Sequence, residues 1–267
     1  MLAELKPKTS QVNGRLWSTR ARDWAEVQEP QFKPLYQAVF DRLKVGTGTR
    51  YLDAGCGSGV AAGMAAGRGA RVAGLDAAEA LLAIARSRAP DGEFRHGDLE
   101  QLPFEDGGFD LVTGFNAFQY AGNPAMALAE AGRVAKREGA VVVATWGEPS
   151  GMPLASVLAA LKALLPPPPP GAPGPFALSD ERALREFAEQ AGLRAEAVFD
   201  VRGEFEFASE AEALRGFNSA GIAVRAIEAA GEPAVSDAHA RAIAPFRLPD
   251  GSYRIGATYR CLVARPR

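Results

Sequence analysis

The sequence predicts an α/β fold built on a doubly wound, mostly parallel sheet. From about residue 49 to 146, short apolar strands alternate with amphipathic helices, and strand–helix–strand units of this length form parallel sheets with right-handed crossovers. A glycine-rich turn follows the first strand, and a near-continuous apolar run at 140–145 indicates a central strand covered on both faces. The 267 residues, 47% of them hydrophobic, suit one large domain or one domain with a smaller cap.

The elements of the first half follow in order. Four strands are expected at residues 51–53, 71–76, 93–96 and 109–115. The helix after the second strand stops at Pro90 and gathers its apolar side chains on one face: Ala78, Leu81, Leu82 and Ala85.

The helix that precedes the apolar run has the clearest expected boundaries in the chain. Asn123 is placed to cap it, and Pro124 suits its first turn. Lys136 and Arg137 favour the negative end of the helix dipole, and Gly139 follows as a C-terminal signal.

The alternation of strands and helices stops at the beginning of the second half. Residues 148–178 include the run Pro166 to Pro170 and are expected to form an insertion, with the proline run as a stiff surface linker. Ser179 is expected to cap a helix, and a strand near 195–201 follows. The stretch from Tyr253 to Val263 alternates between two faces, which predicts an antiparallel strand near the edge of the sheet.

Charge and composition disfavour several classes of protein. Lys plus Arg is 30 and Asp plus Glu is 32, a net charge of −2, which disfavours nucleic acid as a partner. Cys56 and Cys261 with two histidines support neither a disulfide framework nor a metal site. The amino-terminal residues lack the apolar core of a signal peptide, and no run reaches membrane-spanning length. A cytoplasmic protein without a membrane partner is expected.

The main chemical signal is the glycine-rich turn that follows Asp53 and Ala54. Gly55, Gly57 and Gly59 allow the backbone to approach a ligand closely, and the helix that follows is expected to offer free amides and a positive dipole end. The context, between a strand and a helix, strengthens this signal.

Two further acids follow the next two strands. Asp76 ends the second strand, 17 residues beyond Gly59, where a carboxylate accepts both hydroxyls of a ribose. Asp98, just after the third strand, is placed to accept a hydrogen bond from an adenine amino group, while the amide of Leu99 faces the ring. A nucleoside-bearing cofactor is therefore indicated.

The residues around the turn discriminate between two such cofactors. A dinucleotide site usually has glycine where this chain has Val60. The acid Asp53 would repel a pyrophosphate but suits an α-ammonium group. One acid for an amine, one for a ribose and one for an adenine together match the groups of S-adenosylmethionine, which is therefore the predicted cofactor.

Several successive motifs resemble those of the class I S-adenosylmethionine-dependent methyltransferases, in particular the ubiquinone/menaquinone-biosynthesis and small-molecule enzymes. The resemblance covers roughly residues 45–146 and rests on five stretches: 51–59, 74–76, 97–104, 109–112 and 133–140. It implies a seven-stranded, Rossmann-like methyltransferase sheet with an antiparallel last strand and a helical lid or insertion.

The resemblance also implies the contacts of the cofactor. The methionine end would meet Asp53, Ala54, Gly55 and Gly57. The ribose would meet Asp76 and Ala77, and the adenine Asp98 and Leu99. Asn116, just past the fourth strand, would lie near the sulfonium. Phe115-Asn116-Ala117-Phe118 departs from the Asn/Asp-Pro-Pro-Tyr/Phe signature of enzymes that methylate adenine or amide nitrogen, which disfavours those targets.

The resemblance suggests a division of the chain as well. The expected parts are an N-terminal helical lid (1–44), a cofactor-binding core (45–147), the Pro-rich insertion (148–178), the rest of the core sheet (179–207 and 245–267) and a helical cap (208–244). In related enzymes the N-terminal segment closes over the cofactor, and Trp24 would then face the sulfonium by cation–π attraction, whereas Trp17 is expected to pack the segment onto the sheet.

Candidates for a general base are few. His96 lies near the cofactor motif, but a packed residue at a strand end is expected there, and His239 in the cap is expected to be solvated. Tyr120 follows the fourth strand, where it is placed to face a pocket, while Tyr253 and Tyr259 are expected in the core.

These observations predict a methyltransferase that moves a methyl group from S-adenosylmethionine to an oxygen, nitrogen or carbon of a small molecule, leaving S-adenosylhomocysteine. One alternative is an NAD(P)-dependent oxidoreductase, which shares the sheet and the acid after the second strand. A second is a non-catalytic module that binds S-adenosylmethionine. A third keeps the methyltransferase but makes protein or RNA its substrate. The acceptor, the use of a base and the oligomeric state stay open at this stage.

Overall fold

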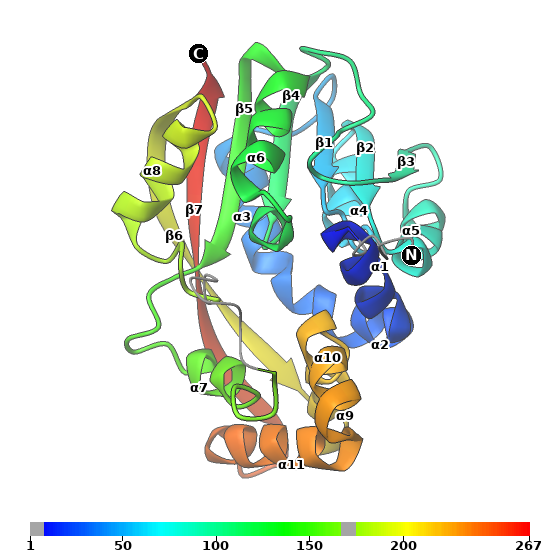
Figure 1. The fold of residues 1–267 in the computed structure, drawn as a ribbon, viewed down its shortest axis with the longest axis vertical. Helices are drawn as coiled ribbons and strands as arrows, with labels where there is room; N and C mark the ends of the chain where they lie inside the picture. The colour runs from blue at the N-terminus through cyan, green and yellow to red at the C-terminus, as the bar shows by residue number, and fades with distance from the viewer. Residues whose placement is uncertain (1–7, 167–174) are drawn as a thin grey trace, which may run out of the picture.

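Seven strands form one sheet in the order β3-β2-β1-β4-β5-β7-β6, with helices on both faces (Figure 1). The computed structural model describes residues 8–166 and 175–267. The strands are β1 (Arg50–Ala54), β2 (Arg71–Asp76), β3 (Glu93–His96), β4 (Phe109–Phe115), β5 (Ala135–Trp146), β6 (Leu193–Phe207) and β7 (Tyr253–Pro266). The first five pair in parallel, and β7 is antiparallel to both β5 and β6. The predicted fold class is confirmed.

The order of the strands indicates at which edge of the sheet a ligand is expected to bind. The chain leaves β1 toward β2 on one side and later returns to β4 on the other side of β1. In open α/β sheets, ligands bind outside the carboxyl ends of the strands at such a reversal. The glycine-rich turn and the end of β4 meet there.

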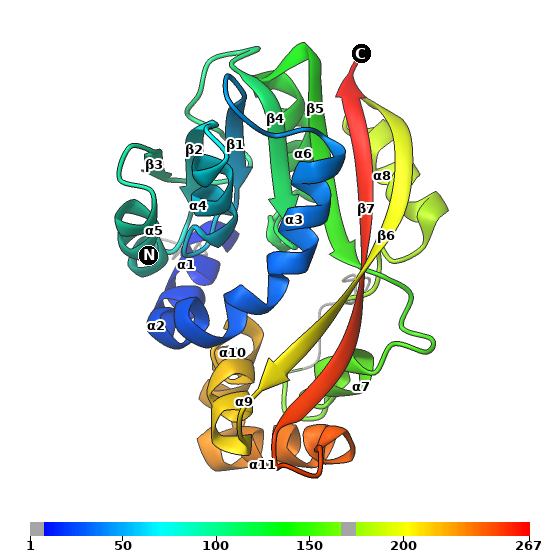
Figure 2. The ribbon, with the colours of Figure 1, turned by 180° about the vertical axis from the view of Figure 1, so that it is seen from behind.

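Two cores lie on opposite faces of the sheet. One contains α3 (Lys33–Arg42), α4 (Val60–Gly67) and α5 (Glu79–Arg88), in front in Figure 2. The other contains α6 (Pro124–Val134) and α8 (Glu181–Gln190), in front in Figure 1. The predicted apolar face of α5 is confirmed, because its members are at most 2% exposed: Ala78, Leu81, Leu82 and Ala85.

The predicted end of α6 is wrong, although its beginning is confirmed. The Asn123 side chain accepts a hydrogen bond from the amide of Met126 at 3.1 Å, but the helix ends at Val134. Lys136, Arg137 and Gly139 belong instead to the first residues of β5. The backbone is extended from residue 135 onward because this residue pairs with the start of β4.

The predicted cap of α8 is also displaced by one residue. Asp180, not Ser179, accepts the hydrogen bond from the amide of Ala183, at 2.8 Å. Ser179 is only 5% exposed. Because α8 begins at Glu181, Asp180 stands at the capping position, and its negative charge suits the positive end of the helix dipole.

A group of three helices lies at the far end of the last two strands, apart from the other strands of the sheet. In Figures 1 and 2, β6 and β7 continue beyond the carboxyl ends of β4 and β5, and α9, α10 and α11 lie at their far end. These helices are α9 (Glu210–Phe217), α10 (Gly221–Ala230) and α11 (Glu232–Ile243). The strand predicted near 195–201 is longer because it pairs with β7 along its whole length. It forms the edge of the sheet, and β7 lies next to it, antiparallel and near the edge as predicted.

The alternation of β7 is confirmed. Every second residue from Tyr253 to Val263 is buried in the core that also contains α3. On the opposite face Arg260 pairs with Asp200 of β6, with Nε and Oδ1 2.8 Å apart.

The N-terminal segment folds against the carboxyl edge of the sheet. It consists of α1 (Thr9–Thr19), α2 (Ala21–Asp23), the π-helix η1 (Trp24–Gln28) and the 3₁₀ turn η2 (Glu29–Phe32). Helix α1 packs against α5 and α10. The π-helical turn is of interest because such turns are frequent at functional sites.

Short helices occupy the remaining connections. They are η3 (Phe118–Tyr120), α7 (Leu154–Ala159) and η4 (Ala244–Phe246). Of the predicted proline linker, residues 167–170 lie outside the described residues, as do residues 1–7 and 171–174. No helix in the described part of the chain is long and apolar enough to cross a membrane.

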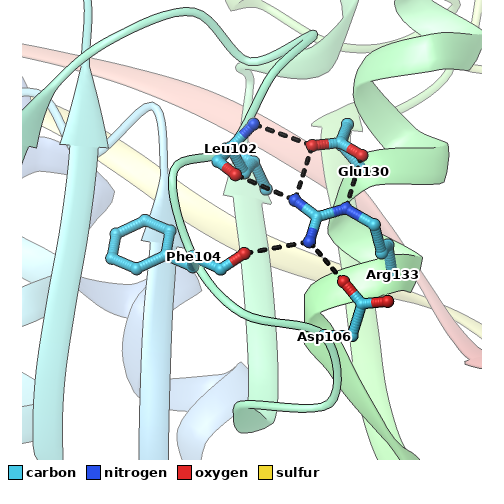
Figure 3. Close-up of polar contacts among 5 residues, drawn as sticks. All are labelled: Leu102, Phe104, Asp106, Glu130 and Arg133. Carbon is cyan, nitrogen blue, oxygen red and sulfur yellow. Dashed lines mark hydrogen bonds and ion pairs between the residues drawn. The ribbon is translucent and has the colours of Figure 1, made fainter.

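The connection between β3 and β4 contains no helix. It is held in place by hydrogen bonds to a single arginine, Arg133. The Arg133 guanidinium of α6 donates to the carbonyl oxygens of Leu102 and Phe104 at 2.8 and 2.9 Å, and to the carboxylates of Asp106 and Glu130 (Figure 3). Glu130 in turn accepts from the amide of Leu102 at 2.8 Å. The cluster therefore ties residues 102–106 of this connection to α6, a few residues after the predicted adenine contacts Asp98 and Leu99.

Candidate cofactor and acceptor site

The turn after β1 requires glycine at three positions. Gly55, Gly57 and Gly59 have φ angles of 81°, 53° and 79°, in the region that other residues rarely adopt. A Cβ at Gly59 would lie 2.9 Å from the Cα of Ala85, and one at Gly57 would lie 3.1 Å from a carboxylate oxygen of Glu29. The turn is therefore packed closely from both sides.

Glu29 occupies the amino end of the helix that follows this turn. Its carboxylate accepts from the amides of Ser58 and Val60 at 2.9 and 3.1 Å, and from the Ser58 hydroxyl at 2.5 Å. The prediction of free amides at this helix end is thus wrong for these two groups. The reason is tertiary, because the N-terminal segment brings an acid to the positive end of the α4 dipole.

A second contact joins the same segment to the core. The guanidinium of Arg88 donates to the carbonyl oxygens of Ser58, at 3.0 Å, and of Ala25, at 2.6 Å. Glu29 is 3% exposed, and its burial raises the pKa of its carboxyl, while its hydrogen bonds to Ser58 and Val60 lower it. The η1–η2 segment is therefore anchored to the glycine turn by charged groups on both sides.

Asp53 lies at the bottom of the site, 2% exposed. It accepts a hydrogen bond from the Thr113 hydroxyl at 3.0 Å, and that hydroxyl is 2.6 Å from the Tyr51 hydroxyl. Burial raises the pKa of Asp53 to about 7, and the nearby charge of Glu29 acts in the same direction. No cation in the described residues pairs with Asp53, so the carboxylate is suited to a positively charged ligand.

Asp76 stands at the end of β2 and orders the turn on its other side. Its two oxygens accept from the amides of Gly57 and Ala78, both at 2.8 Å. Burial raises its pKa, whereas these amide hydrogen bonds lower it. Each carboxylate oxygen keeps a second lone pair, so both are still able to accept from a ribose hydroxyl.

The predicted adenine residues lie beside helix α1. The Ser10 hydroxyl donates to Asp98 at 2.8 Å, and Leu99 is half-buried. Gly14 of α1 packs directly on the main chain of Ala77, since a Cβ at Gly14 would lie 2.2 Å from the Ala77 oxygen. The structure thus brings Ala77 and Asp98 together under one helix.

Asn116 follows β4 in an unusual conformation, with φ of 50°. Its side-chain oxygen accepts from Gln119 at 3.1 Å, while its amide nitrogen and the Gln119 oxygen are buried without a partner in the described residues. A strained backbone and unpaired amides at the switch point of the sheet are typical of a ligand-contacting segment.

The two predicted tryptophans are in contact with each other. Trp17 and Trp24 pack edge to face, with ring centroids 4.7 Å apart, and Trp24 lies 6.0 Å from Phe32. Trp24 also packs against both the sheet core and the small α2–α5 cluster. Its predicted contact with the sulfonium stays a prediction.

The three candidate bases, His96, His239 and Tyr120, lie in different surroundings and do not form one site. His96 is exposed rather than packed, with Nε2 3.0 Å from the Ala77 oxygen. His239 is buried rather than solvated, 3% exposed, because its Nδ1 lies 2.7 Å from the Asn218 oxygen inside the cap. Burial lowers the pKa of His239 to about 4, so it is neutral. Tyr120 is 38% exposed.

Sequence reasoning missed Glu29, Arg88 and Tyr36. Glu29 and Arg88 are charged residues on an expected lid and an expected helix, where charges are ordinarily solvated. Tyr36 belongs to an amphipathic helix and reads as a core residue. No local signal marks the three. Only the fold brings Glu29 and Arg88 to the glycine turn, and Tyr36 to Phe115 at the end of β4.

The geometry defines a class: a Rossmann-like sheet with several buried acids at its switch point. Residues 52–143 match the model of a methyltransferase domain. A demethylmenaquinone methyltransferase of Renibacterium salmoninarum is 32% identical over 157 residues, which are 59% of this chain and 62% of that protein. A ubiquinone biosynthesis O-methyltransferase of Hahella chejuensis is 34% identical over 119 residues, 40% of this chain and 50% of that protein.

Solved structures share the fold. The [4+2]-cyclase SpnF superimposes with a TM-score of 0.59 at 20% identity, covering 97% of each chain. A putative methyltransferase in complex with the Haloferax volcanii Trm112 activator also gives 0.59, at 19% identity, covering 97% of this chain and 98% of that one. Residues 52–143 thus resemble a methyltransferase domain, and the fold is that of solved methyltransferase structures. The sequence matches span about 50 to 62% of the two relatives named above.

Proposed function

We propose that the protein transfers the methyl group of S-adenosylmethionine to a small molecule. One observation supports this most directly: three acids surround the glycine turn, and one of them, Glu29, already holds two of the amides at the start of α4. The fold alone is less specific, because one structural neighbour is a [4+2]-cyclase.

The acids fit this cofactor and disfavour a dinucleotide. The pyrophosphate of NAD(P) needs the free amides of a helix amino end, where this chain presents the Glu29 carboxylate. A pyrophosphate would meet like charge from Glu29 and Asp53 at close range. The ammonium and sulfonium of S-adenosylmethionine would instead compensate both acids.

Each part of the site has a role in this proposal. Asp53 would hold the α-ammonium group, Asp76 and Ala77 the ribose, and Asp98 and Leu99 the adenine. When bound, the cofactor would supply an activated methyl group, whose bond to sulfur breaks as the bond to the acceptor atom forms, with S-adenosylhomocysteine as the leaving group. The chain contributes proximity and a dry pocket: α1 covers the nucleoside end and the η1–η2 segment closes the methionine end.

The acceptor side of the proposal involves no assigned base. His239 is neutral within the cap, and His96 and Tyr120 are exposed. An acceptor that ionises on its own, or that loses its proton after the transfer, requires none. A small molecule is favoured as the acceptor because of the near-neutral charge of the chain and the quinone-pathway names of its relatives.

Calorimetry tests the cofactor. The protein is titrated with S-adenosylmethionine, S-adenosylhomocysteine and NADH, beside an Asp76→Asn variant and a control, Asp91→Asn, at an exposed acid between α5 and β3. We expect the first two ligands to bind to the parent and the control, to lose affinity in Asp76→Asn, and NADH not to bind. Binding of NADH, or of none of the three, would overturn the proposal.

A further inference from the structure

A groove of about 910 Å³ lies at the amino ends of β1, β2 and β3, opposite the strand ends that carry the candidate cofactor site. In a doubly wound sheet, a helix normally follows each parallel strand and covers the sheet. Residues 97–108, all of them described, connect β3 to β4 without a helix and cross the front of β1 and β2 in Figure 1. The groove is therefore bounded by the sheet, by residues 101–105 of this connection and by one side of α6.

Two arginines lie side by side in this groove. Arg50 of β1 and Arg71 of β2 are register partners in neighbouring parallel strands, so their side chains share the face of the sheet that α6 covers. Outside the sheet, each donates its main-chain amide, to Asp110 and to the Thr49 oxygen, both at 2.8 Å. Both side chains are exposed, and neither guanidinium forms a hydrogen bond or ion pair with a described residue.

This arrangement is unfavourable in the free protein, because like charges on neighbouring positions of a sheet repel each other. A ligand with negative charge between the two guanidiniums would remove the repulsion and accept their hydrogen bonds. The pair of arginines thus points to an anion.

The other charged groups of the groove are compensated within the protein, with one exception. Arg95 pairs with Glu93 on β3. Arg133 pairs with Glu130 on α6 (Figure 3). Glu105 is exposed and forms no ion pair with a described residue. Two arginines and one glutamate are therefore the uncompensated charges that a ligand would meet.

The groove also has an apolar wall. Phe104 of the connection and Phe109 of β4 pack edge to face with centroids 5.3 Å apart, and the Arg50 guanidinium lies 5.8 Å from the centroid of Phe109. The hydrogen bonds of Arg133 to the oxygens of Leu102 and Phe104, at 2.8 and 2.9 Å, hold this wall in place (Figure 3). The volume of the groove falls within the range of about 300–1,000 Å³ that is usual for sites of small organic ligands.

We propose that this groove is a second ligand site, which binds a small organic phosphate monoester. Arg50 and Arg71 would hold the phosphate, because two guanidiniums match the two negative charges of a monoester near neutral pH, whereas a carboxylate compensates only one of them. The apolar wall at Phe104 would take the organic part. The site lies at the opposite end of the strands from the candidate cofactor site, and the inference does not depend on the proposed function.

Calorimetric titration of the full chain tests the proposal, at pH 8 and low ionic strength, where a phosphate monoester is a dianion. The probes are phenyl phosphate, inorganic phosphate, which lacks the organic part, and benzoate, which has a single charge. Each titration is repeated with S-adenosylhomocysteine present. A peptide of six glutamates is titrated separately as an acidic protein segment.

Three variants accompany the parent protein. Arg71→Gln removes one of the two paired charges, and Glu105→Gln removes the uncompensated acid. The matched control is Arg202→Gln, at an exposed arginine of β6 outside the groove. Circular dichroism and thermal unfolding of each ligand-free variant show whether it is folded.

We expect one molecule of phenyl phosphate to bind per chain, at least about threefold more tightly than inorganic phosphate or benzoate. Arg71→Gln should weaken phenyl phosphate by at least about tenfold, the effect of lost hydrogen bonds to a charged group, without lowering the unfolding temperature. Glu105→Gln should tighten it by about two- to threefold, because a like charge leaves the groove. Arg202→Gln should bind as the parent does.

Several results would overturn the inference. They are the absence of saturable binding of phenyl phosphate, a folded Arg71→Gln variant that binds it normally, and benzoate binding as tight as that of phenyl phosphate. Displacement of phenyl phosphate by S-adenosylhomocysteine would place it in the cofactor site instead. Binding of the glutamate peptide but not of phenyl phosphate would identify the groove as a docking site for an acidic protein segment and refute a small-molecule site.

Discussion

Replacing Asp53 by asparagine should stabilise the ligand-free protein. Asparagine has the same size, and its oxygen is still able to accept the hydrogen bond from Thr113. What the change removes is a buried charge, because Asp53 is 2% exposed and has no cationic partner in the described chain.

The magnitude follows from the pKa of this carboxyl, which burial raises from 3.8 to about 7. A group whose pKa is higher in the folded state contributes its stability below the unfolded pKa and loses it as the pH rises through the folded one. Three pKa units correspond to about 4 kcal/mol. The stability of the parent protein should therefore fall between about pH 4 and pH 7 by this amount, and Asp53→Asn should abolish that part of the fall.

Urea unfolding followed by circular dichroism measures the effect at pH 5, 6, 7 and 8. The advantage of Asp53→Asn over the parent should grow with pH and reach about 4 kcal/mol at pH 8. The control Asp110→Asn should have the opposite sign, because Lys136 and the amide of Arg50 hold the pKa of Asp110 below its usual range. An Asp53→Asn protein that is no more stable than the parent at pH 8 would refute the reasoning.

Three further predictions follow from the same contacts. Because Asp53 must ionise to pair with an ammonium group, S-adenosylmethionine should bind about tenfold more tightly at pH 8 than at pH 6, with proton release visible by calorimetry in two buffers; a flat profile would contradict this. Gly14→Ala should push α1 away from Ala77 and weaken S-adenosylmethionine binding, whereas Gly67→Ala, with open space around its Cβ, should bind normally and stabilise α4 by up to about 1 kcal/mol; equal affinities in the two variants would exclude a role for α1. Arg133→Lys loses the guanidinium fork that binds Leu102, Phe104 and Glu130, so the unfolding free energy should fall by about 2 kcal/mol in urea; an unchanged midpoint would show that the cluster is dispensable.

Local patterns of the sequence were sufficient for most of the sheet. Strands β2 and β4 begin and end where the apolar runs predict, since a strand buried between two helical layers is mostly apolar. The edge strand β3 also has its predicted bounds, although only Phe94 of its four residues is buried. The glycines at 55, 57 and 59 mark the turn because only glycine adopts its positive φ angles without strain. The alternation from Tyr253 to Val263 was equally readable, because one face of β7 is buried.

Errors at the element ends have a common cause. Lys136, Arg137 and Gly139 have the chemistry of a helix end, yet they lie in β5, because pairing between β4 and β5 draws the chain into an extended conformation. Helix signals act over one turn, whereas strand pairing depends on a partner more than twenty residues away.

The residues of the candidate site also fall into those that the sequence predicts and those that it does not. The positions of Asp53, Asp76 and Asp98 were predictable, because each lies at or within two residues of the carboxyl end of a strand and all three strands end at one edge of the sheet. The position of Glu29 at the start of α4 and the burial of His239 were not predictable, because both depend on packing between segments far apart in the chain. The amino-acid sequence thus determined the sheet and the acids along its edge. Only the tertiary structure decided which charges and hydroxyls are buried beside them, because burial is a property of neighbours in space rather than in sequence.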